Sequence, residues 1–220
     1  MRCNPLFATI AVLAGLLSGA ASAQSPDTHH HRFGDADKWA KVFDDPARDV
    51  WQKPHEVIAA LKLAPDSAVA DIGSGTGYFA ARLAHFVPQG RVYAVDTEPD
   101  MVKYLAERAK REGLANLASL VGAPDDPRLP AKVDLILMVD MYHHIAEREK
   151  YFSKLRESLK AGGRIAIIDF SEDAAMGPPK RERISPERVR SELGQAGYVL
   201  AEKHAFLPNQ YFLVFRPAGR

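Results

Sequence analysis

Three glycines at alternate positions carry the clearest chemical signal in the sequence. Residues 69–79 read VADIGSGTGYF, so a short apolar run is followed by Gly73, Gly75 and Gly77 and then by an apolar helical pattern. Glycine has no Cβ, so it adopts positive φ and lets a ligand approach the backbone, and a following helix presents unpaired N–H groups. We therefore predict a strand, a ligand-binding loop and a helix start. The simpler alternative is a tight turn that binds nothing.

Carboxylate and imidazole side chains lie at the ends of the apolar runs that we expect to be strands. Asp71 and Asp96 lie at the ends of two such runs, and Asp140 follows a third and precedes Tyr142, His143 and His144. Parallel strands end at one edge of a sheet, which is where such folds bind ligands. A histidine with a pKa near 6.5 can accept a proton there at neutral pH.

Apolar runs alternate with helical patterns along most of the chain. We predict strands at 69–72, 92–95, 118–121, 133–139 and 165–169, with Gly162 and Gly163 in the loop before the last of them, and helices at 78–87, 99–113, 146–159 and 186–196. This alternation is typical of βαβ units and predicts an α/β, doubly wound, Rossmann-like parallel sheet. The runs 198–206 and 210–215 are joined by only three residues, which allows only an antiparallel hairpin.

The glycine spacing separates the possible ligands. A dinucleotide loop needs a small residue at position 78, where this chain has Tyr78, and no Gly-Lys-Ser/Thr follows as in a P-loop. The motif Asp71-x-Gly73-x-Gly75-x-Gly77 instead resembles that of class I S-adenosylmethionine-dependent methyltransferases. The chain is similar to the small-molecule enzymes of ubiquinone and menaquinone biosynthesis over about residues 54–217. The resemblance implies a seven-stranded sheet, mostly parallel, with a C-terminal antiparallel hairpin.

The resemblance also implies roles for the residues that match the motif. Asp71 would hold the loop and meet the ammonium group of S-adenosylmethionine, and the backbone at Ser74, Gly75 and Thr76 would face its methionine part. Asp96 lies nineteen residues after Gly77 (96 − 77), where the family's acid binds both ribose hydroxyls.

The adenine contacts are less well specified. Thr97 and Met101 could pack on the ring. Many relatives carry an acid for the adenine amine where this chain has Ala123, so either Asp125 replaces it or backbone and shape hold the ring. Asp140 completes the predicted cofactor contacts.

Methyl transfer needs an aligned acceptor and, for an acidic group, removal of a proton. His143 is our first candidate for the general base and His144 the second; either could instead brace a helix start. Tyr142 could stack on the substrate or belong to the core. Asp140 and Asp169 resemble part of the magnesium site of catechol-type methyltransferases, but Phe170 replaces the expected Asn, so we predict no metal.

The segment 171–184 should lie over the same edge and help to select the acceptor. Lys180, Arg181 or Arg183 could bind an anionic acceptor, or the segment could be an exposed connection.

We therefore expect a methyltransferase acting on a small-molecule O, N or C acceptor. One alternative is an exported protein that binds S-adenosylmethionine or S-adenosylhomocysteine without catalysis; another is a nicotinamide-dependent oxidoreductase, which Tyr78 disfavours. Because 29 Lys and Arg nearly balance 28 Asp and Glu, nothing in the composition indicates nucleic-acid binding. The sequence does not predict the oligomeric state.

The first residues have the layout of a secretory signal. Arg2 precedes an apolar run, and Ala21-Ser22-Ala23 fits a cleavage site, so we predict a signal peptide at 1–23 and a periplasmic or secreted protein. A polar segment and a helical lid would occupy 24–53, and the methyltransferase domain 54–217. After cleavage we expect no stable membrane insertion; an uncleaved leader would instead anchor the chain in the inner membrane.

Fractionation of bacteria that express the full-length gene tests this prediction. We expect a periplasmic protein whose N-terminus, read by mass spectrometry, is Gln24. A cytoplasmic protein with the intact mass would contradict export.

Overall fold

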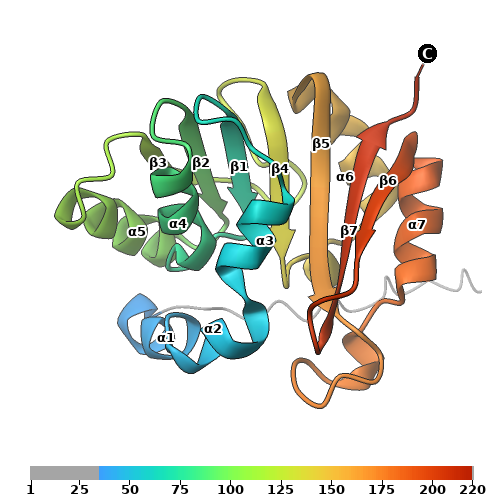
Figure 1. The fold of residues 1–220 in the computed structure, drawn as a ribbon, viewed down its shortest axis with the longest axis horizontal. Helices are drawn as coiled ribbons and strands as arrows, with labels where there is room; N and C mark the ends of the chain where they lie inside the picture. Colours follow the sequence, from blue (N-terminus) through green and yellow to red (C-terminus); the bar gives the residue numbers. More distant parts are fainter. Residues whose placement is uncertain (1–34, 220) are drawn as a thin grey trace, which may run out of the picture.

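The computed structural model describes residues 35–219, which contain a seven-stranded sheet of order β3-β2-β1-β4-β5-β7-β6 (Figure 1). The strands are β1 Ala68–Ile72, β2 Arg91–Asp96, β3 Leu117–Val121, β4 Val133–Val139, β5 Leu159–Phe170, β6 Tyr198–His204 and β7 Gln210–Pro217. Strand β7 runs antiparallel to both its neighbours, and the other strand pairs are parallel. The predicted doubly wound sheet with a C-terminal hairpin is confirmed.

Helices cover both faces of the sheet (Figure 1). They are α1 Ala36–Phe43, α2 Ala47–Gln52, α3 Pro54–Ala60, α4 Tyr78–Phe86, α5 Pro99–Arg111, α6 Arg148–Leu155 and α7 Pro186–Gln195, with short 3₁₀ turns η1 Tyr142–His144, η2 Arg156–Ser158 and η3 Lys180–Glu182. Leu135 and Leu137 of β4 pack with α3, α4 and α5, whereas Ile136 and Met138 pack with α6 and α7. Alternate residues thus enter opposite cores, which explains the continuous apolar run.

Three local features differ from the sequence predictions. Helix α2 was not predicted, and the helix predicted at about 146–159 is present as α6, whose last turn continues as the 3₁₀ turn η2. The expected loop at Gly162 and Gly163 lies inside β5, where the register with β4 shifts between Val133 and Leu135. Gly162 has φ +77, so a bulge in the strand uses the conformation that we had attributed to a loop.

Helices α1 and α2 lie at the edge of the sheet where the parallel strands end, beside the connection that follows β5 (Figure 1). This is the position expected of a lid, although lid motion stays a prediction. The predicted signal peptide and most of the polar segment fall in residues 1–34, outside the described residues, so export also stays a prediction. Among the described helices, none is long and apolar enough to cross a bilayer.

Replacement of Gly77 by alanine tests how the glycine loop packs on α5. Gly77 has φ +94, and an added Cβ would strike Leu105. Gly113 also has a positive φ, of +70, but open space surrounds it. We expect Gly77→Ala to lower the free energy of unfolding in urea by about 2–3 kcal/mol and Gly113→Ala by only about 1 kcal/mol. Equal losses would show that backbone strain alone explains the glycine.

Candidate active site

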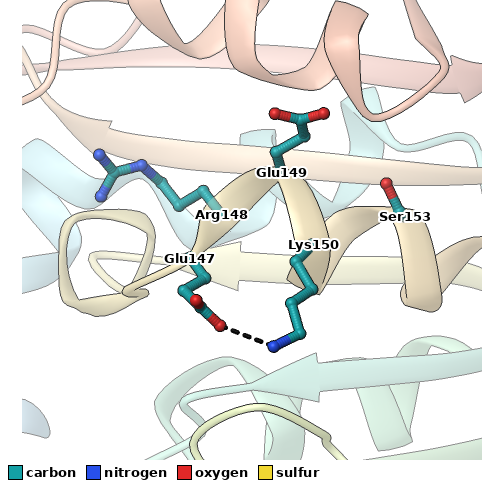
Figure 2. Close-up of a pocket in the computed structure, with 5 residues that line it drawn as sticks. All are labelled: Glu147, Arg148, Glu149, Lys150 and Ser153. Carbon is teal, nitrogen blue, oxygen red and sulfur yellow. Dashed lines mark hydrogen bonds and ion pairs between the residues drawn. The ribbon is translucent and has the colours of Figure 1, made fainter.

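A cavity of about 700 Å³ opens at the carboxyl edge of the sheet. The glycine loop, the ends of β2 and β4, helices α1 and α2 and the segment after β5 line it. This volume is typical of small-molecule sites. A smaller hollow of about 340 Å³ lies over α6, lined by polar side chains that include the exposed Glu147–Lys150 ion pair (Figure 2). It brings together no candidate residue, so the larger cavity is the candidate site.

The glycine loop has the conformation that its sequence predicts. The φ angles of Gly73, Gly75 and Gly77 are +77, +52 and +94. The N–H groups of Gly73 and Ser74 both donate to Val95 O, at 2.8 and 3.0 Å, which fixes the loop on β2. A Cβ at Gly75 would lie 3.4 Å from the ring of Phe43 in α1. The Phe43 ring of α1 therefore packs directly against the loop at Gly75.

Two buried carboxylates flank this loop. The Asp71 side chain is buried, and burial, followed by the charge of Asp96, raises its pKa to about 7, while Arg48 opposes the shift. The Asp96 carboxylate accepts hydrogen bonds from the N–H groups of Gly75 at 2.8 Å and Glu98 at 3.0 Å. Burial also raises the pKa of Asp96. Both carboxylates gain from a ligand that brings positive charge or hydroxyl donors.

The cavity lining fits S-adenosylmethionine. Its charged residues are five acids and one guanidinium: Asp71, Asp96, Glu98, Asp140, Glu182 and Arg48. A ligand with a sulfonium, an ammonium and one carboxylate carries a net positive charge and complements this lining. Among the described residues, Thr76 Oγ1 is one of the few buried polar atoms without a hydrogen-bond partner, and Thr76 lines the cavity, so a ligand carboxylate could accept its hydrogen bond.

Of the residues predicted to contact adenine, some line the cavity and one does not. Thr97 and Met101 line the cavity, as do Ala123 and Pro124. Asp125 does not line it: its side chain is 74% exposed and pairs with Lys154 at 3.7 Å. The prediction that Asp125 contacts adenine therefore finds no support, and the alternative of backbone and shape fits the apolar lining.

His143 forms a buried pair with Asp169. Its Nδ1 lies 3.0 and 2.9 Å from the two carboxylate oxygens, and its backbone N–H donates to the same carboxylate at 3.2 Å. Burial alone would lower the pKa of His143, but the hydrogen bond and charge of Asp169, with the nearby charges of Asp140 and Glu182, raise it. This contact assigns the proton to Nδ1 and leaves Nε2 as an acceptor.

The two neighbours of His143 have different positions. His144 also lines the cavity, and its ring lies against that of His143 at a centroid distance of 4.1 Å. Tyr142 is fully buried beside Phe152 and donates its hydroxyl to Glu192 at 2.5 Å. It does not line the cavity, so the structure contradicts the prediction that it contacts substrate and favours a core role.

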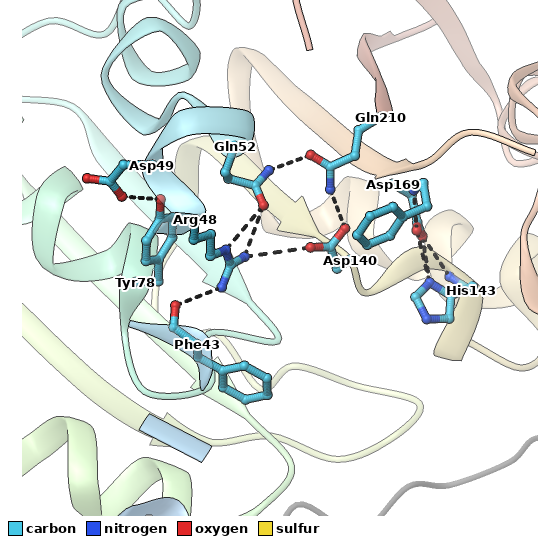
Figure 3. A network of polar contacts seen from close by, with 10 residues as sticks. Phe43, Arg48, Asp49, Gln52, Tyr78, Asp140, His143, Asp169 and Gln210 are labelled. Atoms are coloured by element: carbon cyan, nitrogen blue, oxygen red, sulfur yellow. Dashed lines mark hydrogen bonds and ion pairs between the residues drawn. The ribbon is translucent and has the colours of Figure 1, made fainter. Parts of the chain in front are cut away.

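Sequence reasoning missed a polar network that joins α2 to the sheet (Figure 3). Arg48 of α2 donates to Phe43 O at 3.1 Å and to Gln52 Oε1, and lies 3.6 Å from Asp140 Oδ2. The buried Gln52 donates to Gln210 Oε1 at 2.6 Å, and Gln210 donates to Asp140. Asp140 has φ +55, and burial and then Asp169 raise its pKa to about 7, while Arg48 opposes the shift. The polar Gln210 at the start of an apolar strand was the only sequence signal.

Tyr78 provides a second link to α2 (Figure 3). Its hydroxyl donates to Asp49, and its ring lies between the guanidinium groups of Arg48 and Arg82, each 4.1 Å from the centroid. Helix α1 is held as well, because Arg108 of α5 pairs with its C-cap residue Asp44 at 3.0 Å. Tyr78, whose size argues against a dinucleotide loop, therefore holds helix α2 in place above the glycine loop.

Comparison with known proteins agrees with this geometry. Residues 69–163 match the family described as Methyltransferase domain. The crystal structure of a SAM-dependent methyltransferase from Aquifex aeolicus has a TM-score of 0.75 and 28% identity, covering 82% of this chain and 97% of that one. The family match, the relatives and the fold together support a class I S-adenosylmethionine-dependent methyltransferase. S-adenosylmethionine is the cofactor of this class.

Curated relatives include enzymes with unlike acceptors. Trans-aconitate 2-methyltransferase of Afipia carboxidovorans is 28% identical over 84% of this chain and 68% of its own length. Arsenite methyltransferase of Halobacterium salinarum is 28% identical over 73% of this chain, but the match spans only 43% of that relative. The names of these relatives have methyl transfer in common and differ in the acceptor.

The segment after β5 does not present the cations predicted for an anionic acceptor. Arg183 donates to the backbone carbonyls of Pro178, Ser171, Glu172, Ala174 and Met176, at 2.8 to 3.2 Å. Lys180 and Arg181 do not line the cavity. Arg183 therefore holds the segment together, and the proposed binding of an anion by these side chains finds no support.

Substitutions at Asp96 and Asp125 test the donor site. We expect Asp96→Ala to weaken S-adenosylhomocysteine binding, measured by calorimetry, by roughly ten- to a hundredfold, because hydrogen bonds to a charged group contribute about 1.5–3 kcal/mol. Asp125→Asn, outside the cavity, should leave the affinity unchanged. The reverse order of effects would refute the assignment of Asp96 to the ribose.

Proposed function

We propose that this methyltransferase transfers the methyl group of S-adenosylmethionine to a small-molecule O, N or C acceptor, with His143 as the general base. The observation that carries this proposal is the His143–Asp169 pair at the cavity wall, next to Asp140. A histidine buried against a carboxylate beside an open cavity is a recurrent arrangement for proton removal.

The chain's own residues would bind and orient the donor. Asp96 would accept hydrogen bonds from the ribose hydroxyls, Asp71 would meet the ammonium group, and the loop backbone from Ser74 to Thr76 would face the methionine part. When bound, S-adenosylmethionine supplies an electrophilic methyl group whose C–S bond breaks, with its electrons left on sulfur, as the acceptor atom bonds to the carbon. Helices α1 and α2 would exclude water from this reaction.

His143 would take the proton from the acceptor. Asp169 holds Nδ1, so Nε2 is the ring nitrogen that can accept a proton. The imidazolium that forms is then stabilised by the same carboxylate. His144 lies against the ring of His143 and would limit its rotation.

The activities named for these relatives do not identify the acceptor. Trans-aconitate is a tricarboxylate and arsenite a metalloid species that thiols bind. The only cysteine of this chain, Cys3, lies outside the described residues. The proposal therefore rests on the donor site and the histidine pair.

The pH dependence of turnover tests the role of His143. A base must be neutral, so kcat should rise with pH through the pKa of His143, which Asp169 holds above its ordinary value. Asp169→Asn should shift this rise in kcat to lower pH, because it removes the charge that raises the pKa of His143. His143→Ala should lower kcat by roughly a hundred- to ten-thousandfold. S-adenosylhomocysteine formation over a panel of phenols, amines and activated carbon acids is the measurement.

Two outcomes would contradict the proposal. Turnover that His143→Ala leaves unchanged would remove His143 from the mechanism. Tight S-adenosylmethionine binding without turnover on any acceptor would instead favour a binding protein without catalysis.

A further inference from the structure

Different strands of the sheet form the two ends of the cavity. Strands β2, β1, β4 and β5 are consecutive neighbours, so Asp96 and the cavity wall at His143 and Phe170 lie at opposite ends of the carboxyl edge. The donor's ribose end belongs to Asp96. The acceptor must therefore lie at the β4–β5 end, between α2 and the segment after β5.

Negative charge surrounds this acceptor end. Asp140 and Glu182 line it, and Asp169 lies directly behind His143. The Glu182 carboxylate pairs with Arg181 Nη2 at 3.2 Å, but the Arg181 side chain is 72% exposed, so water screens the pair. The Glu182 side chain is 17% exposed, and its charge acts on His143. An anionic acceptor would be desolvated beside like charges.

No arginine or lysine of the described cavity lining remains available to an anion. Arg48 is the one guanidinium there, and its donors go to Phe43 O, Gln52 and Asp140. Arg183 donates to backbone carbonyls of its own segment. A carboxylate or phosphate on the acceptor would therefore find no arginine or lysine to pair with.

The walls of this end are apolar and partly aromatic. The rings of Trp51 in α2 and Phe170 at the end of β5 lie 5.9 Å apart at an interplanar angle of 39°, and both line the cavity. Pro178 and Pro179 add to the lining. Gly177 has φ +103, and a Cβ there would strike the Phe170 ring, so the segment lies directly against that ring. Apolar walls that include aromatic rings favour an aromatic ligand.

We propose that the methyl acceptor is an uncharged or cationic aromatic molecule, and that Glu182 helps to exclude anionic acceptors. The acceptor would present one weakly acidic group to His143 while its ring lies beside Trp51 and Phe170. This inference rests on the proposed function, because it assumes that the donor fills the Asp96 end.

Three probes that share a phenol ring and differ in charge test the inference: methyl 4-hydroxybenzoate, tyramine and 4-hydroxybenzoate. Each is titrated by calorimetry into the full protein saturated with S-adenosylhomocysteine. We expect the neutral ester and the cationic amine to bind. The dissociation constant of the anion should be higher than that of the ester by roughly tenfold or more. Glu182→Gln should raise the affinity for the anion relative to the ester by roughly threefold or more.

Glu172→Gln provides the matched control, because Glu172 lies in the same segment, is exposed and does not line the cavity. It should leave the ratio of affinities unchanged, and unchanged S-adenosylhomocysteine affinity in both variants would show that they are folded. Equal binding of anion and ester would overturn the inference, as would S-adenosylhomocysteine binding with no ester or amine binding. Failure to bind S-adenosylhomocysteine at all would instead refute the proposed function on which it rests.

Discussion

The contact between Arg48 and Asp140 is the interaction on which the geometry of the site depends. Four strands place Asp71, Asp96, Asp140 and Asp169 at one edge of the sheet, where burial makes their charges costly. Arg48 opposes the raised pKa values of both Asp71 and Asp140. The Arg48 and Asp140 side chains are only 14% and 23% exposed, so water screens their contact less than it would on the surface. The same guanidinium binds Phe43 O and Gln52, so α1 and α2 lie over the cavity as a consequence of that charge balance.

The order of the strands divides the chemistry between the two ends of this edge. The glycine loop and Asp96 lie at β1 and β2, whereas His143 follows β4 and pairs with Asp169 of β5. Donor and acceptor can therefore meet over β1 and β4 while different side chains bind each of them. The alignment of the acceptor with the C–S bond, which contributes much of the catalysis of a displacement, then follows from the strand order. The acceptor end can then vary in sequence while the donor end is kept.

The parts predicted from the sequence are those that depend on local pattern. The apolar runs and helical spacing predicted the sheet and hairpin, and the glycine spacing predicted the positive φ angles of Gly73, Gly75 and Gly77. The network of Arg48, Gln52 and Gln210 could not be predicted, because Gln52 and Gln210 are 158 positions apart and only the fold brings them together. The sequence left Tyr142 open between a substrate contact and a core role, because adjacent residues of a 3₁₀ turn point in different directions; in the structure His143 lines the cavity and Tyr142 lies in the core.

A crystal structure of the protein with S-adenosylhomocysteine is the most direct test of the account. We predict that the ribose hydroxyls lie within hydrogen-bond distance of the Asp96 carboxylate, that α1 covers the nucleoside, and that the sulfur points toward the β4–β5 end beside His143. Electron density for the nucleoside away from Asp96, or for the sulfur directed away from His143, would contradict it.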